Sequence, residues 1–169
     1  MSPTNADNTA VAPVLVIGYG NPARGDDGLG PLLADRLEDW LAKSGIKAVE
    51  VLVDFQLNVE HVLDLAGRNK VLLIDASTQG RAPFKCEAVR PFADATHTTH
   101  AVSPQGLLDT YCRLMDRAPP SVELLSVPGN AFELGAPMSE QTLRHAERAW
   151  QFLRDWCERA VQAGAVGHA

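Results

Sequence analysis

The chain has 169 residues, of which 46% are hydrophobic, and it carries a formal net charge of −6 at pH 7. This length and composition suit a single globular domain. The negative charge, with no basic cluster, argues against nucleic acids and anionic membranes as partners. No apolar run approaches the roughly 20 residues that a membrane-spanning helix needs.

The two ends of the chain and its cysteines set the expected boundaries and compartment. Residues 1–12 lack the basic start and apolar centre of a signal peptide. We therefore expect a flexible tail over residues 1–12, one α/β domain over 13–163 and a C-terminal tail over 164–169. The three cysteines are far apart and form no CxxC pair, which favours free thiols in a cytoplasmic protein.

The first half of the chain predicts alternating strands and helices. An apolar strand over residues 14–18 runs into a glycine-rich turn, and a helix follows over residues 28–43, with Pro31 in its first turn and Gly45 after its end. A second strand covers residues 48–53. A short helix capped by Asn58 follows, and its expected apolar face comprises Val59, Val62, Leu63 and Ala66.

The second half continues the alternation. The continuous apolar run over residues 71–74 predicts a buried strand that ends on Asp75. A strand over residues 86–90 and a polar loop over 94–102 come next. Ser103-Pro104 predicts a helix start, residues 122–127 predict another strand, and Ser139 is expected to cap a final helix.

This order of elements predicts an α/β fold. We expect a doubly wound, mostly parallel twisted sheet with helices on both faces, which makes three layers. Ligands of such sheets bind beyond the carboxyl ends of the strands. That edge is therefore the place to look for a functional site.

The turn after the first strand carries an unusual charge pattern. Gly18, Gly20 and Gly25 resemble a turn that holds phosphate at a helix N-terminus, but Asp26 and Asp27 stand where the phosphate would lie. Two carboxylates repel an anion and attract a cation. Helical periodicity turns Asp26 away from Asp27, so we expect Asp26 to matter less.

Three side chains are expected at the carboxyl edge of the sheet. Asp27 follows the first strand, Asp75 ends the third, and His100 precedes the helix that starts at Ser103. Two carboxylates and an imidazole suit a divalent transition metal with open positions. Each residue also has a plainer interpretation: Asp27 as a helix cap, Asp75 as a turn residue and His100 as a surface histidine.

Other polar residues receive structural interpretations. His97 has HxxH spacing with His100, but we expect it to be solvated. Asp54 ends the second strand, where it could bind a ribose, although a role in capping the following turn is favoured. His61, His145 and His168 are expected at the surface.

Several motifs together resemble one family. They are Gly18-Tyr-Gly-Asn21, Gly25-Asp-Asp-Gly-Leu-Gly30, Leu73-Ile-Asp-Ala76, His100 before the capped helix, and the stretch from Val127-Pro128-Gly129 to Ser139. In this order they resemble the [NiFe]-hydrogenase maturation endopeptidases, peptidase family M52, over about residues 13–155. Gln56-Leu57 further resembles the branch that serves soluble NAD-reducing hydrogenases.

The resemblance implies a specific activity. Such proteins remove a C-terminal extension from the precursor of the hydrogenase large subunit once nickel is loaded. Metal-binding and catalytic positions of the family map onto Asp27, Asp75 and His100. The nickel is supplied mainly by the substrate, no organic cofactor is implied, and a cytoplasmic monomer is expected. The family commonly has glutamate where this chain has Asp27, so the side chain here is one methylene shorter.

Two other functions fit parts of the sequence. Gly18, Gly20 and Ala23 satisfy a loose GxGxxA pattern, which suits a Rossmann-like nucleotide-binding module. A nickel-binding chaperone would keep the same ligands without cleaving anything. The sequence contains no GxSxG or HExxH motif, so a conventional serine hydrolase or zinc protease is not predicted.

Overall fold

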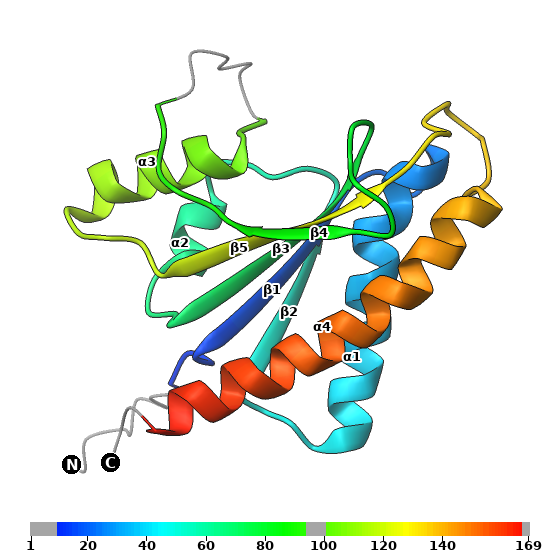
Figure 1. Cartoon of the computed structure of the whole chain (residues 1–169). Helices are drawn as coiled ribbons and strands as arrows, with labels where there is room; N and C mark the ends of the chain where they lie inside the picture. Colours follow the sequence, from blue (N-terminus) through cyan, green and yellow to red (C-terminus); the bar gives the residue numbers. More distant parts are fainter. Residues whose placement is uncertain (1–9, 94–100, 167–169) are drawn as a thin grey trace, which may run out of the picture.

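The computed structural model describes residues 10–93 and 101–166 and shows a five-stranded sheet between two layers of helices (Figure 1). Strands β1 (Val14–Tyr19), β2 (Val49–Asp54), β3 (Lys70–Ser77) and β5 (Ser121–Pro128) are parallel. Strand β4 (Lys85–Ala88) pairs antiparallel with β5 at one edge, and the order is β2-β1-β3-β5-β4. The predicted mostly parallel, doubly wound sheet is confirmed.

The helices divide between the two faces of the sheet. Helices α1 (Leu29–Ser44) and α4 (Glu140–Val166) cover one face, and α2 (His61–Leu65) and α3 (Pro104–Met115) cover the other. Alternate residues of β1 serve the two cores: Val14 and Val16 pack toward α1 and α4, whereas Leu15 and Ile17 pack toward α2 and α3. Burial on both faces explains why these strands are continuous apolar runs.

Helix boundaries follow the predicted signals in three places. The chain enters α1 through a short 3-10 turn, η1 (Gly25–Gly28), and Gly45 ends the helix in the left-handed conformation. Ser103 caps α3 by accepting a hydrogen bond from the Gly106 N–H at 3.0 Å. The Ser139 hydroxyl accepts from the Thr142 N–H at 3.2 Å, which caps α4 as predicted.

The prediction for the short helix was partly wrong. Asn58 does not cap α2, because its side chain accepts from the Glu60 N–H ahead of the helix. Leu63 is 72% exposed, whereas His61, expected at the surface, is only 5% exposed. Burial of His61 is possible because its Nδ1 accepts a hydrogen bond from the Asn58 N–H, which satisfies the ring locally.

The chain ends differ slightly from the predicted tails. Helix α4 continues to Val166, past the expected boundary at residue 163, because Gly164 between alanines costs a helix only about 1 kcal/mol. Ala12, placed in the N-terminal tail, is held by a hydrogen bond from Arg68 to its carbonyl oxygen. Within residues 10–93 and 101–166, no helix is long and apolar enough to cross a membrane.

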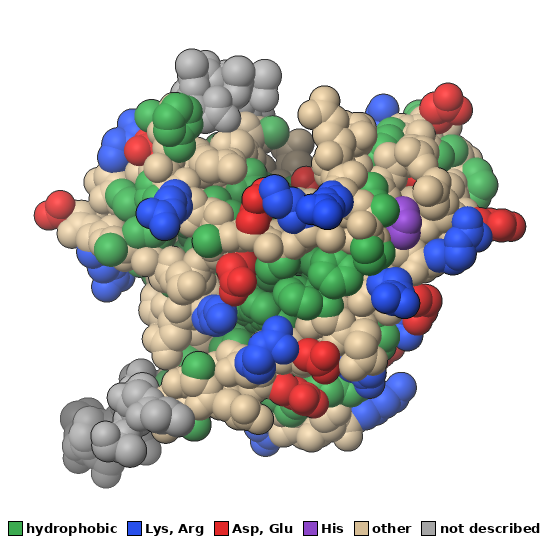
Figure 2. All heavy atoms as spheres, viewed as in Figure 1, with side chains coloured by type: hydrophobic (Ala, Val, Ile, Leu, Met, Phe, Trp, Pro, Cys, Tyr) green, Lys and Arg blue, Asp and Glu red, His purple; other side chains and the backbone are tan. Residues whose placement is uncertain are grey.

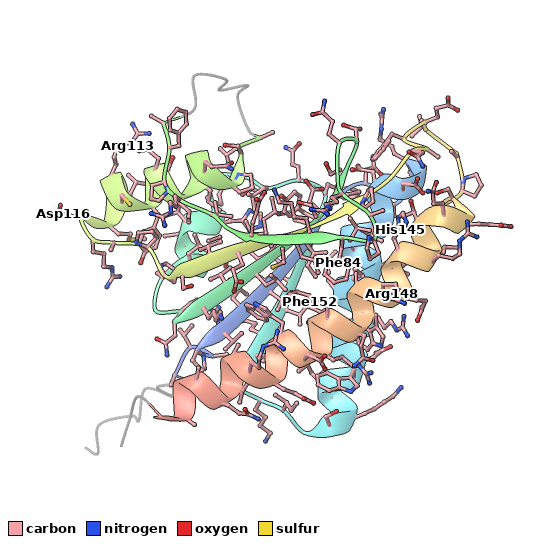
Figure 3. All side chains as sticks on the ribbon, in the orientation of Figure 1. Phe84, Arg113, Asp116, His145, Arg148 and Phe152 are labelled. Carbon is pink, nitrogen blue, oxygen red and sulfur yellow. The ribbon has the colours of Figure 1, made fainter. Side chains whose placement is uncertain are left out.

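An aromatic pair closes the core between β4 and α4. Phe84 and Phe152 have ring centroids 5.1 Å apart. Figure 2 shows hydrophobic side chains gathered at the centre of this face of the molecule. Figure 3 shows both rings between the strand and the helix. Both residues pack against the core on the α1 and α4 side of the sheet, so their role is structural.

Close contact between β1 and α1 leads to a first prediction. A Cβ on Gly30 would lie 2.6 Å from the Ile74 carbonyl oxygen and closer still to that of Tyr19, and these backbone atoms cannot move aside. We expect Gly30→Ala to lower the free energy of unfolding by about 3 kcal/mol. Gly164→Ala is the control, because nothing lies within 4 Å of that position. Denaturant unfolding measures both, and an equal stability for the two variants would contradict the close contact.

Candidate active site

The turn between β1 and α1 uses nearly all of its own backbone donors. Gly20 N–H donates to the Asp54 carbonyl, Arg24 N–H to the Asn21 carbonyl, and Asp27 N–H to the Arg24 carbonyl. The N–H groups of Asn21 and Ala23 donate to the side chains of Asp27 and Asn21. Gly20 and Gly25 have φ angles of 142° and 55°, which lets the chain make these contacts.

Asp26 anchors this turn from within the protein. Its side chain is fully buried and accepts hydrogen bonds from the N–H groups of Asn130, Ala131 and Ser139 at 2.7–2.9 Å, and from the Ser139 hydroxyl at 2.9 Å. Burial alone would raise the pKa of Asp26, but these donors lower it to about 2. These hydrogen bonds hold the turn after β1 against the loop before α4. The expectation that Asp26 matters less overlooked this structural role.

Asp27 points to the other side of the turn. One carboxylate oxygen accepts the Asn21 N–H at 2.7 Å. The side chain makes no capping hydrogen bond to α1, whose first position is preceded by Gly28. The interpretation of Asp27 as a helix cap is therefore wrong, and the half-buried carboxylate lines a cavity instead.

Asp75 lines the same cavity from the central strand. The strand β3 continues to Ser77, so Asp75 lies within it rather than ending it. Burial, together with the negative charge of Asp27, raises the pKa of Asp75 to about 7, although hydrogen bonds from the Tyr19 hydroxyl and the Ala76 N–H oppose both effects. A carboxyl group that changes charge near neutral pH suits either proton transfer or cation binding.

The cavity has a volume of about 450 Å³ at the carboxyl edge of the sheet. It is lined by the turn after β1, by the segment after β2 and by the chain before α3: Tyr19, Gly20, Asn21, Arg24, Asp27, Phe55, Gln56, Leu57, Asp75, Ala101 and Val102. The structure thus brings together two of the three predicted site residues. His100 and His97 lie outside the described residues, but Ala101, which follows His100 in the chain, is part of the wall.

Two lining residues were missed by sequence reasoning. Tyr19 ends β1, and since Gly18 pairs with Ile74, the next residue along each strand places Tyr19 level with Asp75. Burial raises the pKa of Tyr19 well above its usual value, and the adjacent Asp75 charge adds to this. Arg24 supplies a cation to the wall. The strand register could have revealed Tyr19, whereas nothing in the sequence singled out Arg24.

The remaining candidates have structural surroundings. Asp54 accepts hydrogen bonds from the Phe55 N–H and the Asn58 side chain, which confirms its predicted role in capping the turn. His145 lies on α4 and is half-buried, and its Nδ1 has no partner among the described residues (Figure 3). His168 lies outside the described residues.

The donor set fits a divalent cation that arrives with other ligands. Two carboxylates that share a cavity repel each other, and a cation between them would remove that repulsion. No group of three or more His, Cys, Asp or Glu side chains suited to a metal occurs within residues 10–93 and 101–166. Further ligands would therefore come from outside that part of the chain or from the molecule that carries the metal.

Comparisons with known proteins identify the fold. No family model and no curated protein sequence matches the chain. Among solved structures, the chain is similar to the [NiFe] hydrogenase maturation protease HycI from Thermococcus kodakarensis KOD1, with a TM-score of 0.64 and 19% identity over 88% of this chain and 94% of that one. It is also similar to the hydrogenase maturating endopeptidase HybD from E. coli, with a TM-score of 0.65 and 20% identity over 87% and 93% of the two chains.

A third structure gives the same result. The hydrogenase 2 maturation peptidase from Thaumarchaeota archaeon SCGC_AB-539-E09 has a TM-score of 0.61 and 22% identity, over 85% of this chain and 97% of that one. These alignments span nearly the whole length of each protein, although few residues are identical. The resemblance seen in the motifs is thus confirmed in three dimensions: the chain has the fold of the [NiFe]-hydrogenase maturation endopeptidases.

Proposed function

We propose that the chain is an endopeptidase that removes the C-terminal extension from the nickel-loaded precursor of a [NiFe]-hydrogenase large subunit. The observation that carries the proposal is the pair formed by Asp27 and Asp75, which line one cavity at the carboxyl edge of a sheet with the maturation-protease fold. Gln56-Leu57 resembles the branch of the family that serves soluble NAD-reducing hydrogenases, so we propose that the precursor belongs to a hydrogenase of that kind.

Nickel belongs to the substrate in this proposal. Asp27 and Asp75 would contribute carboxylate oxygens to a nickel ion already held by the precursor, and His100 would contribute an imidazole by its match to the family motif. An ion held in this way can polarise a peptide carbonyl or a water molecule. When it does not hold the ion, Asp75 can accept a proton near neutral pH, because burial and the Asp27 charge raise its pKa to about 7.

The same carboxylates would exclude the wrong substrate. A precursor without nickel brings no cation to the cavity, so its binding would desolvate the carboxylates of Asp27 and Asp75 with no compensating charge from the substrate. A nickel ion in the precursor offsets this desolvation cost, because its positive charge is attracted to both carboxylates. Discrimination therefore rests on a penalty against apo precursor as well as on attraction to the loaded form.

The nucleotide-binding alternative is weakened by the turn itself. In dinucleotide folds, backbone N–H groups at the helix start point toward the phosphates. Here the N–H groups of Gly20, Asn21, Ala23, Arg24 and Asp27 donate to acceptors within the turn or in β2, and Asp26 N–H donates to the Ala131 carbonyl. These donors are not available to a pyrophosphate, and the two carboxylates would repel it.

We further propose that the protein works as a monomer in the cytoplasm. Cys86, Cys112 and Cys157 are free thiols. Burial raises the pKa of both Cys86 and Cys157 to about 12, which keeps these two side chains inert. Free thiols are typical of a reducing compartment.

Processing of a nickel-loaded precursor tests the proposal. We expect the wild type to release the extension, and Asp27→Asn and His100→Ala each to slow release at least about 100-fold, because each removes a group that holds the nickel. Mass spectrometry of the precursor measures both product and rate. A chaperone would bind the precursor and leave it intact.

A matched control shows whether the loss of activity depends on the site or follows the removal of any acidic side chain. Asp109 is a carboxylate on α3 that pairs with Arg113 at 2.8 Å, away from the cavity. Asp109→Asn should process the precursor at the wild-type rate. Equal rates for Asp109→Asn, Asp27→Asn and His100→Ala, with circular dichroism showing all three folded, would contradict the site assignment.

A further inference from the structure

A second depression adjoins the site cavity. It has a volume of about 290 Å³ and is lined by Gly20, Pro22, Pro31, Val53, Asp54 and Phe55. We call it the apolar groove. Gly20 and Phe55 also line the site cavity, so the two depressions share a wall and open side by side.

The walls of the apolar groove present hydrophobic side chains to solvent. Val53 is 47% exposed and Phe55 is 69% exposed, and the two prolines belong to the turn and to the start of α1. The carboxylate of Asp54 is engaged by the Phe55 N–H at 2.6 Å and the Asn58 amide at 3.1 Å. Concave surfaces with exposed apolar side chains commonly bind ligands, because burying them from water is favourable.

The position of the groove explains why it stays open. Strand β2 is the terminal strand of the sheet, and none of the described strands pairs with its outer edge. Val53 lies next to the end of this strand, opposite Gly18 of β1, and the chain then turns at Phe55 toward the site cavity. Because the groove and the site cavity share Gly20 and Phe55, a peptide that approached Asp27 and Asp75 from this edge would pass over the groove.

We propose that the apolar groove binds an apolar side chain of the precursor, close in sequence to the bond that is cut. This inference rests on the proposed endopeptidase function, and it assigns the groove to the recognition of that substrate. In an extended peptide, successive side chains point to opposite sides, so one residue near the scissile bond can enter the groove while the backbone crosses the cavity. A negatively charged residue at that position would be disfavoured, because the Asp54 carboxylate lines the groove and would repel it.

Val53→Asp tests the groove directly, because Val53 does not line the site cavity. A buried charge in place of an apolar contact should raise KM for nickel-loaded precursor about tenfold, with kcat nearly unchanged. Val53→Thr, which keeps the shape, should raise KM in the same direction if Val53→Asp does not fold. Leu114→Asp on α3 is the control, since Leu114 is also exposed and lies elsewhere.

A matching change in the substrate identifies the contact. Apolar residues flanking the cleavage site of the precursor are replaced by serine, one at a time. One replacement should raise KM for the wild type and have little additional effect on Val53→Asp, because both remove the same contact. Effects that multiply for every replacement, or a wild-type KM for Val53→Asp, would overturn the proposal.

Binding without cleavage separates this inference from the proposed function. The Kd of fluorescently labelled, nickel-loaded precursor can be measured by anisotropy, before cleavage proceeds, for the wild type and Val53→Asp. A Kd about tenfold higher in the variant supports the groove even if no cleavage is detected. Equal Kd values would refute the groove even if the wild type processes the precursor.

Discussion

Asp75→Asn is expected to abolish processing of the nickel-loaded precursor and, at pH 8, to make the protein more stable than the wild type. The loss of activity should be at least about 100-fold, because the variant can neither hold a cation nor accept a proton at this position. The gain in stability follows from removing a half-buried charge that lies beside Asp27. A side chain that lowers the stability of the folded protein and is needed for activity is typical of a functional site.

The pH dependence of stability gives this prediction a clear sign. Burial and the Asp27 charge raise the pKa of Asp75 in the folded protein to about 7, whereas an unfolded aspartate titrates near about 4. Between these values only the folded state holds the proton, so the free energy of unfolding falls as the pH rises, and the contribution is lost above about pH 7. Asp75→Asn should lack this fall.

Thermal unfolding from pH 5 to pH 8 checks the sign, and mass spectrometry checks the activity. Asp27→Asn provides a comparison, because removing the neighbouring charge should lower the pKa of Asp75 and shift the fall in stability to lower pH. An Asp75→Asn protein that melts below the wild type at pH 8 and still releases the extension would contradict both the electrostatics and the role of this residue.

Asp26→Asn is expected to lower stability by about 3 kcal/mol, which corresponds to a fall in Tm of roughly 6–12 °C for a domain of this size. The carboxylate accepts four hydrogen bonds from Asn130, Ala131 and Ser139. An amide offers only one acceptor oxygen and places its own N–H groups against these donors. Loss of these hydrogen bonds should also displace Asp27, so the rate of processing should fall together with stability.

The loss of stability at acid pH tests the same hydrogen bonds to Asp26. The pKa of Asp26 is lowered to about 2, so the carboxylate stabilises the folded state fully above about pH 4 and progressively less as the pH falls toward 2. The Asn variant should lose this component. Ser139→Ala should cost only about 1 kcal/mol, because it removes a hydroxyl and leaves the backbone donors. Equal stability of Asp26→Asn and the wild type at pH 7 would show that the hydrogen bonds to the Asp26 carboxylate contribute little to the free energy of unfolding.

The sequence predicted the fold well because its signals are local. The apolar run in β3, the proline and glycine at the ends of α1 and the caps at Ser103 and Ser139 each act within a few residues. Helix α2 was predicted less accurately, because His61 is buried by a hydrogen bond to the Asn58 backbone, which no periodicity reveals. Antiparallel pairing of β4 at the sheet edge also depends on long-range contacts.

The site was predicted in part for the same reason. Parallel strands bring their carboxyl ends together, so Asp27 and Asp75 could be assigned to one edge from their positions alone. The opposite roles of Asp26 and Asp27 could not, because they depend on a loop more than 100 residues away that supplies donors to Asp26. The groove beside Val53 and Phe55 likewise arises only when β2 and the turn after β1 are folded together.

Side-by-side incubation with apo and nickel-loaded precursor tests the central claim most directly. Both forms are presented to the wild type under chelation mild enough to spare the buried nickel, and the products are followed by mass spectrometry. The nickel-loaded precursor should lose its C-terminal extension, while the apo precursor should stay uncut, because only the first brings a cation to Asp27 and Asp75. Equal cleavage of the two forms would contradict nickel-dependent recognition and indicate a peptidase that reads sequence alone.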